Sequence, residues 1–308
     1  MIDFVGKRKW YFRFSGIIIL IGVVFLLSAG LQRGIEFTGG TMMTISFEQE
    51  VVQGDLRAEL ADLGHDDAII QWSEDAEAFI VRTTELSDED VAVIEDTLTE
   101  RLGPLTIIDI YAVSGSIASE IEGDAAIAVS IAAIGILLYV TWAFRRVMKP
   151  FHFGVAAIVA LVHDVLIVLG VFAVLGVFFD IEINTMFIVG VLTVIGYSVN
   201  DTIVVFDRIR ENMIKSPGSP LETTVNHSIM ETLGRSLNTS ITTLFVLLAL
   251  LLLGGATIHN FVLVLIIGVI TGTYSSICIA SQLLVVWESG TFSRLFRRVI
   301  PKRAPAGG

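Results

Sequence analysis

Six long apolar stretches, separated by polar and charged segments, dominate the hydrophobicity pattern of the chain. Each is close to or above the roughly 20 residues that cross a bilayer as a helix. Hydrophobic residues make up 54% of the 308 residues and charged residues only 17%, which is too apolar for an ordinary soluble domain. The pattern predicts an α-helical polytopic membrane protein with six transmembrane helices, which leaves both termini on one side. The predicted spans are residues 14–31, 125–144, 151–178, 185–206, 237–253 and 261–287.

The segment between the first two spans, residues 32–124, alternates strand-like and helix-like periods. Alternating apolar positions predict strands, and apolar positions at helical spacing predict helices. The second helix opens at Ser87 with an acid three residues later, as in a capping box. The resulting order βαββαβ predicts one α+β, ferredoxin-like domain. Its expected strands are 37–47, 68–72, 78–83 and 105–113, and its expected helices are 54–63 and 87–102.

The charges along the chain predict its orientation in the membrane. Sixteen of the 20 basic residues fall before the first span, between spans two and three, between four and five, or after the sixth. By the positive-inside rule these segments are cytoplasmic. We therefore expect a cytoplasmic N-terminus (1–13), a cytoplasmic loop (207–234), a basic cytoplasmic tail (288–308) and an extracytoplasmic domain (32–124). The first span is expected to be a retained anchor, because no small-residue cleavage pattern follows it.

The extracytoplasmic domain is strongly acidic and carries no recognisable catalytic or metal site. It holds 22 of the 32 acidic residues, which argues against a nucleic-acid partner because phosphate binding needs positive charge. His65 has no second ligand candidate at metal spacing, and the single cysteine, Cys278, permits no internal disulfide. Gly39 and Gly40 lie within strand signals rather than before a helix, so we interpret them as a strand bend and not a phosphate loop. We expect neither an enzyme nor a cofactor.

The fourth span contains a carboxylate, Asp201, next to Asn200. A carboxylate at membrane depth costs several kcal/mol unless it is paired, hydrated or protonated, so such residues tend to mark ion or proton pathways. Gly190, Tyr197 and Asp201 fall on one face of a helix, together with Val194. Asp201 is therefore the first candidate for proton coupling, with Tyr197 and Asn200 beside it.

The fifth span begins with a second polar stripe, formed by Arg235, Asn238, Thr239 and Thr242. Packing this stripe against that of the fourth span would remove both from lipid. We therefore predict that Arg235 pairs with Asp201 and that breaking the pair acts as a switch. The alternative is a purely structural ion pair at the membrane edge, because Arg235 could extend its side chain to the headgroups.

Two further spans carry candidate residues. His163 and Asp164 lie a dozen residues into the third span and could form a proton relay, although helical neighbours point in different directions. A purely structural role is an equal alternative, and Asp164 is the stronger candidate of the two. On the sixth span, Gly268, Gly272 and Ser276 form a face of small residues that lets another helix approach closely. Together with Gly190 and Gly196 on the fourth span, these glycines are predicted helix-packing positions.

Four motifs, spread over nearly the whole chain, resemble those of the SecF family of protein-export membrane proteins (SecD/SecF, within the RND-like transporter superfamily). The first follows the first span and contains Gly34, Glu36, Phe37, Gly39 and Gly40, with Glu36 in place of the usual Asp. The others are residues 162–164, 196–212 and 235–240 on spans three, four and five.

The resemblance implies a six-span half of an RND-like transporter in a prokaryotic plasma membrane. It implies pairing with SecD, association with the SecYEG channel, and further contacts with SecA, YajC, the translocating polypeptide and membrane lipids. It also implies that proton flow drives late export and that Asp201 and Arg235 respond to protons. The residues themselves leave proton and sodium coupling equally open, because an isolated carboxylate serves either ion.

Three alternatives stand beside this interpretation. A stand-alone RND-type exporter of lipid or drug would normally need a second six-span half. An intramembrane aspartyl protease would use Asp164 and Asp201, but two catalytic carboxylates must share a proton, and Arg235 would oppose that sharing. A passive scaffold of the export channel would use no ions.

Overall fold

The computed structural model describes residues 2–73, 76–147 and 149–288. The chain divides into two compact units, one formed by Met1–Gln32 with Ile127–Gly308 and one formed by Arg33–Ala126. The first unit is the helical one and the second contains the sheet. The predicted basic tail lies, after its first residue, outside the described residues.

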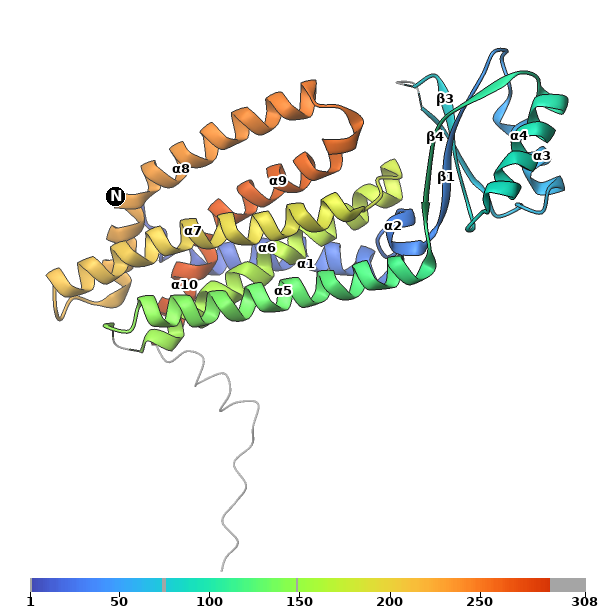
Figure 1. Ribbon diagram of the computed structural model, residues 1–308. Coiled ribbons are helices and arrows are strands. Elements are labelled where there is room, and N and C mark those ends of the chain that lie inside the picture. The colour runs from blue at the N-terminus through green and yellow to red at the C-terminus, as the bar shows by residue number, and fades with distance from the viewer. Residues whose placement is uncertain (1, 74–75, 148, 289–308) are drawn as a thin grey trace, which may run out of the picture. The chain divides into compact units, whose positions relative to one another are not determined.

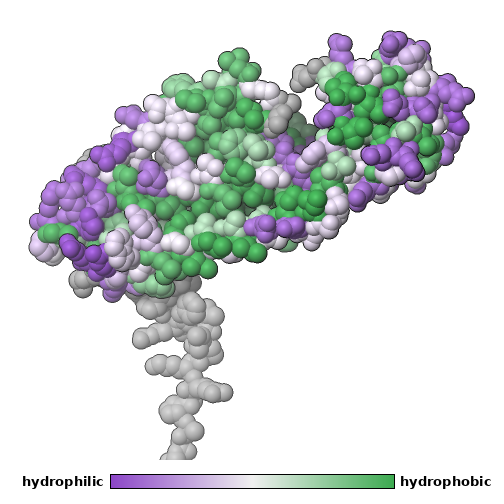
Figure 2. Space-filling model, viewed as in Figure 1, coloured by the Kyte–Doolittle hydropathy of each residue, from purple (hydrophilic) through white to green (hydrophobic). Residues whose placement is uncertain are grey.

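Six helical segments in the described residues are long and apolar enough to cross a membrane, as the hydrophobicity pattern predicted. Figure 2 shows hydrophobic side chains over the visible face of the helical unit and hydrophilic ones at the end where the fourth and fifth spans meet. The sixth span contains a short π-helical segment, η1, between two α-helices. The spans are α1 (Arg8–Ser28), α5 (Gly115–Ala143), α6 (Pro150–Phe179), α7 (Thr185–Lys215), α8 (Leu221–Leu253) and, in the sixth, α9 (Ala256–Ser275), η1 (Ser276–Ala280) and α10 (Ser281–Glu288).

Glycines allow close packing of α7 against the last span. A Cβ atom placed on Gly268 would lie 2.0 Å from Val194, one on Gly272 would lie 2.9 Å from Ser198, and one on Gly190 would lie 2.9 Å from Val264. The small-residue face of the sixth span therefore packs on a helix of the same chain, which the sequence could not decide. Gly196 is exposed, and no atom of the described residues lies within 4 Å of a Cβ placed there, so those residues offer no partner for its predicted packing role.

The closest helix crossing joins α1 to α6 and was not anticipated from the sequence. A Cβ atom on Gly22 would lie 2.7 Å from the Cα atom of Gly170, and the reverse distance is also 2.7 Å. Only hydrogen atoms separate the two backbones at this point. The crossing keeps α1 close to α6, and the buried Ser15 lies two helical turns before it on α1.

The segment 207–234, expected as a cytoplasmic loop, is helical except at residues 216–220. α7 continues to Lys215 and α8 begins at Leu221. Paired side chains explain the extension, because Arg208 forms an ion pair with Glu231 at 2.6 Å across the two helices.

The second unit contains a four-stranded antiparallel sheet in the order β2-β3-β1-β4. β3 lies between β1 and β2, and β1 lies between β3 and β4, which is the connectivity of a split βαβ unit. The element order after a short helix is βαββαβ, in agreement with the sequence prediction. The elements are α2 (Ile35–Thr38), β1 (Gly40–Phe47), α3 (Gln53–Asp62), β2 (Ile69–Ser73), β3 (Ala78–Thr83), α4 (Asp88–Leu102) and β4 (Leu105–Val113).

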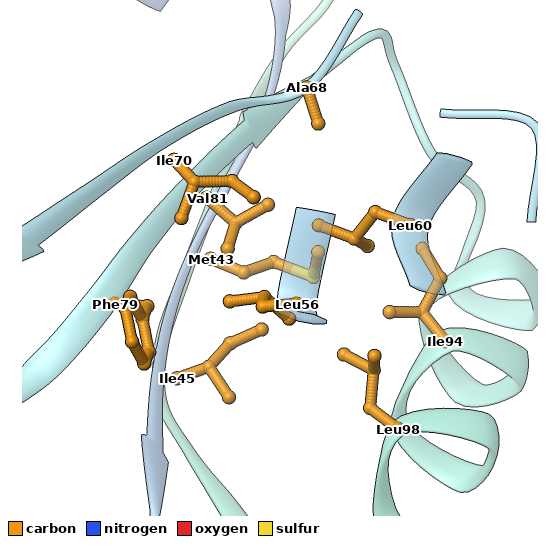
Figure 3. Close-up of a cluster of buried hydrophobic side chains, with 10 residues drawn as sticks. All are labelled: Met43, Ile45, Leu56, Leu60, Ala68, Ile70, Phe79, Val81, Ile94 and Leu98. Atoms are coloured by element: carbon orange, nitrogen blue, oxygen red, sulfur yellow. The ribbon is translucent and has the colours of Figure 1, made fainter. Parts of the chain in front are cut away.

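One face of the sheet packs against the two helices to form the core of this unit. Figure 3 shows Met43 and Ile45 of β1 facing Leu56 of α3 and Leu98 of α4. All four side chains are at most 1% exposed. The alternation of the strands and the helical spacing of leucines thus produce a single closed core.

The expected strand 37–47 begins too early, because residues 35–38 form the helical turn α2 and β1 starts at Gly40. Gly34, Glu36 and Phe37 therefore precede the strand. Gly39 has φ +73° and Gly40 has φ +124°, values that L side chains rarely adopt. A Cβ atom on Gly40 would also lie 2.4 Å from the carbonyl oxygen of Thr83. The glycine pair turns the chain from α2 into the sheet, close to the predicted bend.

The capping box of α4 provides the first test. The Ser87 hydroxyl accepts a hydrogen bond from the backbone N–H of Asp90, and the Asp90 carboxylate accepts one from the backbone N–H of Ser87. This backbone donor holds the pKa of Asp90 below its ordinary value. Ser87→Ala should destabilise the start of α4 by about 1 kcal/mol. Hydrogen exchange of the full chain should show residues 88–91 exchanging roughly fivefold faster. Ser87→Thr keeps the oxygen and should exchange as the parent does; equal exchange in both variants would contradict the cap.

The α1–α6 crossing provides the second test. Gly22→Leu would insert a side chain where the backbones touch, and overpacking of this kind costs about 1–3 kcal/mol. Thermal unfolding of the purified chain in detergent should occur several degrees lower. Gly16→Leu is the matched control, because it lies on the same helix with nothing within 4 Å. Equal melting of both variants would show that the crossing contributes little.

Candidate functional site

Asp201 lies on α7 within the helical unit and is only partly satisfied. Its Oδ1 atom accepts a hydrogen bond from the Ser236 hydroxyl at 2.6 Å. Its Oδ2 atom is buried and has no hydrogen-bond partner within the described part of the chain. A buried polar atom without a partner costs about 1–3 kcal/mol, and more when it is charged. Asp201 is therefore held in place by one helix of its own chain while half of its carboxyl group remains available.

Arg235 does not pair with Asp201 in this structure. The side chain of Arg235 is exposed, and within the ranges the structure describes no ion pair joins it to Asp201. Successive helical residues differ by about 100° in direction, so the neighbouring Ser236 faces inward instead. The predicted stripe of Asn238 and Thr239 is exposed too.

The inward face of α8 is a ladder of hydroxyl side chains spaced four residues apart. Its members are almost fully buried: Ser228, Thr232, Ser236 and Ser240. Small hydroxyl residues at i, i+4, i+8 and i+12 were the signal that the sequence interpretation missed in favour of the arginine. A helix with such a face lies close to its neighbour and hydrogen-bonds to it.

Tyr197 contacts this hydroxyl ladder one turn away from Asp201. Its phenol donates to the Ser240 hydroxyl at 3.4 Å, and Ser240 also contacts the Thr273 hydroxyl of α9 at 2.5 Å. Tyr197 therefore shares the α7–α8 interface with Asp201, as the helical spacing predicted. Asn200 is exposed, and within the described residues no hydrogen bond joins its side chain to this interface.

Asp164 on α6 is a fully buried carboxylate whose two oxygens both have hydrogen-bond partners. It is 1% exposed, and its Oδ2 atom accepts hydrogen bonds from Ser198 of α7 at 2.5 Å and Ser275 of α9 at 2.7 Å. Its Oδ1 atom lies 2.9 Å from Nδ1 of His163. The expectation that these helical neighbours diverge is wrong, because the imidazole turns back along the helix. Asp164 thus ties three helices together.

The His163 imidazole continues this cluster to α1. Its Nε2 atom lies 3.0 Å from the Ser15 hydroxyl, which in turn lies 3.1 Å from the Tyr274 phenol of α9. The phenol donates to the backbone carbonyl of Tyr11 at 3.1 Å. Ser15 and Tyr274 were not singled out from the sequence, because neither carries a charge and both belong to spans remote from the third.

A π-helical segment follows directly after this cluster. η1 begins at Ser276, whose hydroxyl lies 2.9 Å from that of Thr202 on α7. π-helical turns are rare and occur frequently at functional sites. Ser275, the last residue of α9, contacts Asp164, and Ser276 contacts Thr202, the residue after Asp201, so the start of η1 lies between the two polar sites.

The two carboxylates do not form a proton-sharing dyad of the aspartyl-protease kind. Asp164 is bonded by Ser198, Ser275 and His163, whereas Asp201 is bonded by Ser236. No hydrogen bond joins Asp164 to Asp201 in the described segments. The geometry therefore suits two separate polar sites within one helix bundle.

Comparison with protein families gives two matches. Residues 93–290 match the family described as protein export membrane protein SecD/SecF, C-terminal, and residues 24–51 match the SecD/SecF GG motif. The second match contains the glycine pair at 39 and 40, and the first contains Asp164 and Asp201 with the serine and histidine side chains that bond to them.

Individual proteins agree with this assignment. The chain is 44% identical to protein translocase subunit SecF of Thermobaculum terrenum over 99% of both chains, and 33% identical to protein translocase subunit SecDF of Bacillus subtilis over 93% of this chain and 38% of that protein. The crystal structure of SecDF from Thermus thermophilus, described as a translocon-associated membrane protein, superposes with a TM-score of 0.80 at 36% identity, covering 94% of this chain and 39% of that one. The chain therefore belongs to the SecD/SecF family of protein-export membrane proteins, as a SecF-like subunit.

Proposed function

We propose that this chain works with SecD in the plasma membrane and uses the proton gradient to promote late export of polypeptides through the SecYEG channel. Asp201 is the proton-responsive group. The observation that carries the proposal is the buried Oδ2 atom of Asp201, which has no hydrogen-bond partner within the described residues, while Oδ1 accepts from Ser236. Such a carboxyl group can be ionised or protonated according to what lies next to it.

The neighbours of Asp201 differ in which protonation state of its carboxyl group they stabilise. Ser236 supplies one neutral donor, which leaves a charge on the carboxylate poorly compensated within apolar helices. Arg235 would stabilise the ionised form if it approached. Because the two residues lie about 100° apart around α8, a rotation of that helix would exchange one for the other. Protonation of Asp201 then favours the arrangement seen here, and loss of the proton favours the Arg235 pair.

The available energy is adequate for such a change. One elementary charge crossing about 100 mV of membrane potential is worth roughly 2.3 kcal/mol. That amount shifts a two-state equilibrium roughly fiftyfold, since 1.4 kcal/mol is a factor of ten. Beside Asp201 and Tyr197, α8 presents the small hydroxyl side chains of Ser236 and Ser240 to α7, which suits repeated rearrangement. Asp164 is a further proposed proton-coupling residue, separate from the Asp201 interface.

The partners follow from the size of the chain and its surfaces. This chain covers 39% of the solved SecDF chain, so a separate SecD subunit would supply the remainder. The outward apolar faces of α5 and α8 suit lipid or that partner, with Leu138 65% and Leu253 88% exposed. We place both termini in the cytoplasm and the acidic sheet unit outside, where it contacts the translocating polypeptide. SecA and YajC are further proposed partners. Because the similar proteins are named SecF or SecDF, we do not favour the alternative function of a stand-alone lipid or drug exporter.

Replacing Asp201 tests the proposal directly. Asp201→Asn keeps the shape and the Ser236 contact but removes the titratable group. Export of a precursor into proton-energised vesicles should fall at least tenfold at normal protein levels. Asp207→Asn is the matched control, because Asp207 lies two turns further along the same helix, is exposed, and pairs only with Arg210 within the described residues. It should export as the parent does.

The double variant Asp201→Asn with Arg235→Gln separates structure from switching. If the pair were only structural, neutralising both charges should restore export along with folding. We expect a folded chain that remains inactive. Undiminished export by Asp201→Asn alone would exclude the proposed role of Asp201 and would favour a passive scaffold.

A further inference from the structure

The buried pair of His163 and Asp164 has no part in the Asp201 switch, although every polar side-chain atom of the pair has a hydrogen-bond partner. It joins α1, α6, α7 and α9 through side chains that are at most 6% exposed, apart from the half-buried Tyr274. A purely structural tie would need only the serine donors on Asp164. The additional row from His163 through Ser15 to Tyr274 leads toward the beginning of α1.

The donors and acceptors in the row from His163 through Ser15 and Tyr274 to the Tyr11 carbonyl determine which atom carries each proton. The carbonyl of Tyr11 can only accept, so the phenol of Tyr274 donates its single proton to it. The phenol oxygen must then accept from the Ser15 hydroxyl. Ser15 has no second proton, so Nε2 of His163 must donate to Ser15. The network therefore assigns His163 a proton on Nε2.

The contact between His163 and Asp164 holds one more proton. Oδ2 of Asp164 already accepts from two serines, and Nδ1 and Oδ1 lie 2.9 Å apart. Without a proton between them, two lone pairs would face each other. One proton can reside on Nδ1, giving an ion pair, or on Oδ1, giving two neutral groups. Both arrangements carry zero net charge, which is what an apolar helix bundle tolerates.

We propose that His163 and Asp164 form a second proton-holding site, with Ser15 and Tyr274 as its exit toward the N-terminal end of α1. This deepens the proposed function, on which it rests, by adding a proton path distinct from Asp201. Every donor in the row points from His163 toward Tyr11, so the row is oriented to release a proton in that direction. The positive-inside rule places that end in the cytoplasm, the direction in which a proton gradient drives protons.

The release step balances without any group beyond water. The Oδ1–H bond of Asp164 breaks as Nδ1–H forms on His163, and Nε2–H breaks as the proton joins Ser15. Ser15 passes its original proton to Tyr274, and Tyr274 passes its own to a water molecule at the helix end. Asp164 remains as a carboxylate and His163 as the neutral Nδ1–H tautomer. A new proton on Asp164, reorientation of the Ser15 and Tyr274 hydroxyl groups, and a change of His163 from the Nδ1–H to the Nε2–H tautomer restore the starting state.

Few other ionisable groups can influence this step. Within the described residues, those on the packed helices near the pair are Tyr11 of α1, Asp201 of α7, Tyr274 of α9 and the buried Cys278 of η1. The basic residues of α1 lie at its start, and Arg13 is exposed. The exposed charges therefore have little electrostatic effect on the pair of His163 and Asp164, and its proton occupancy depends on the hydrogen-bonded row of Ser15 and Tyr274.

Isosteric variants test the path in the full chain reconstituted with its SecD partner in vesicles. Tyr274→Phe removes the phenol hydroxyl. Ser15→Val and Ser15→Thr have the same shape, and Val carries a methyl group where Thr keeps the hydroxyl. Under an imposed pH gradient, inward proton flux should fall at least tenfold in the first two and stay within twofold in Ser15→Thr. Tyr139→Phe, on the exposed face of α5, is the matched control. Melting temperatures should stay within a few degrees throughout.

The outcomes separate this inference from the proposed function. Normal flux in Tyr274→Phe and Ser15→Val, with flux lost in Asp201→Asn, overturns the second path and leaves the Asp201 switch intact. Normal flux in all three overturns both. Loss of flux together with early melting, unrelieved by Ser15→Thr, shows a structural tie and also overturns the path. A solvent isotope effect on flux that is present in the parent and absent in Ser15→Val supports it.

Discussion

The structure depends on accommodating two carboxylates inside apolar helices, where each charge costs several kcal/mol if left alone. The protein treats the two differently. Asp164 receives two serine hydroxyls and an imidazole from three helices, so its position determines how α6, α7 and α9 meet. Asp201 receives one serine hydroxyl and keeps an unsatisfied oxygen. The hydrogen bonds of Asp164 hold the helix bundle together, and the incomplete hydrogen bonding of Asp201 suits a carboxyl group that changes its protonation state.

Close helix packing makes both arrangements possible. Hydroxyl groups of serine and threonine are short, so they can bond across an interface only where backbones approach closely. Gly272 admits Ser198 to α9, and the Gly22–Gly170 crossing keeps α1, with Ser15, beside α6. The glycines and the hydroxyl residues therefore act as one system. Replacing a glycine here would move a hydrogen-bond partner as well as a helix.

Much of the architecture could be predicted from the sequence, because it depends on local periodicity. The six spans, the βαββαβ order and the capping box at Ser87 each follow from patterns within a few turns of chain. The arrangement of the polar site could be predicted less well from the sequence. Whether Arg235 or Ser236 faces Asp201 depends on a rotation of α8 by about 100° around its axis, and the pattern of polar residues on one helix does not determine that rotation. The bond between Ser15 and His163 joins residues 148 positions apart, and η1 has no sequence signature.

The central claim is that Asp201 changes its protonation state as the gradient is applied. Infrared difference spectroscopy on chain labelled with isotopic aspartate, compared with Asp201→Asn, measures this directly. The account predicts a protonated carboxyl band that grows on acidification, disappears on alkalinisation, and is absent from the variant. A band pattern identical in parent and variant at every pH would contradict it, because Asp201 would then remain in one state throughout.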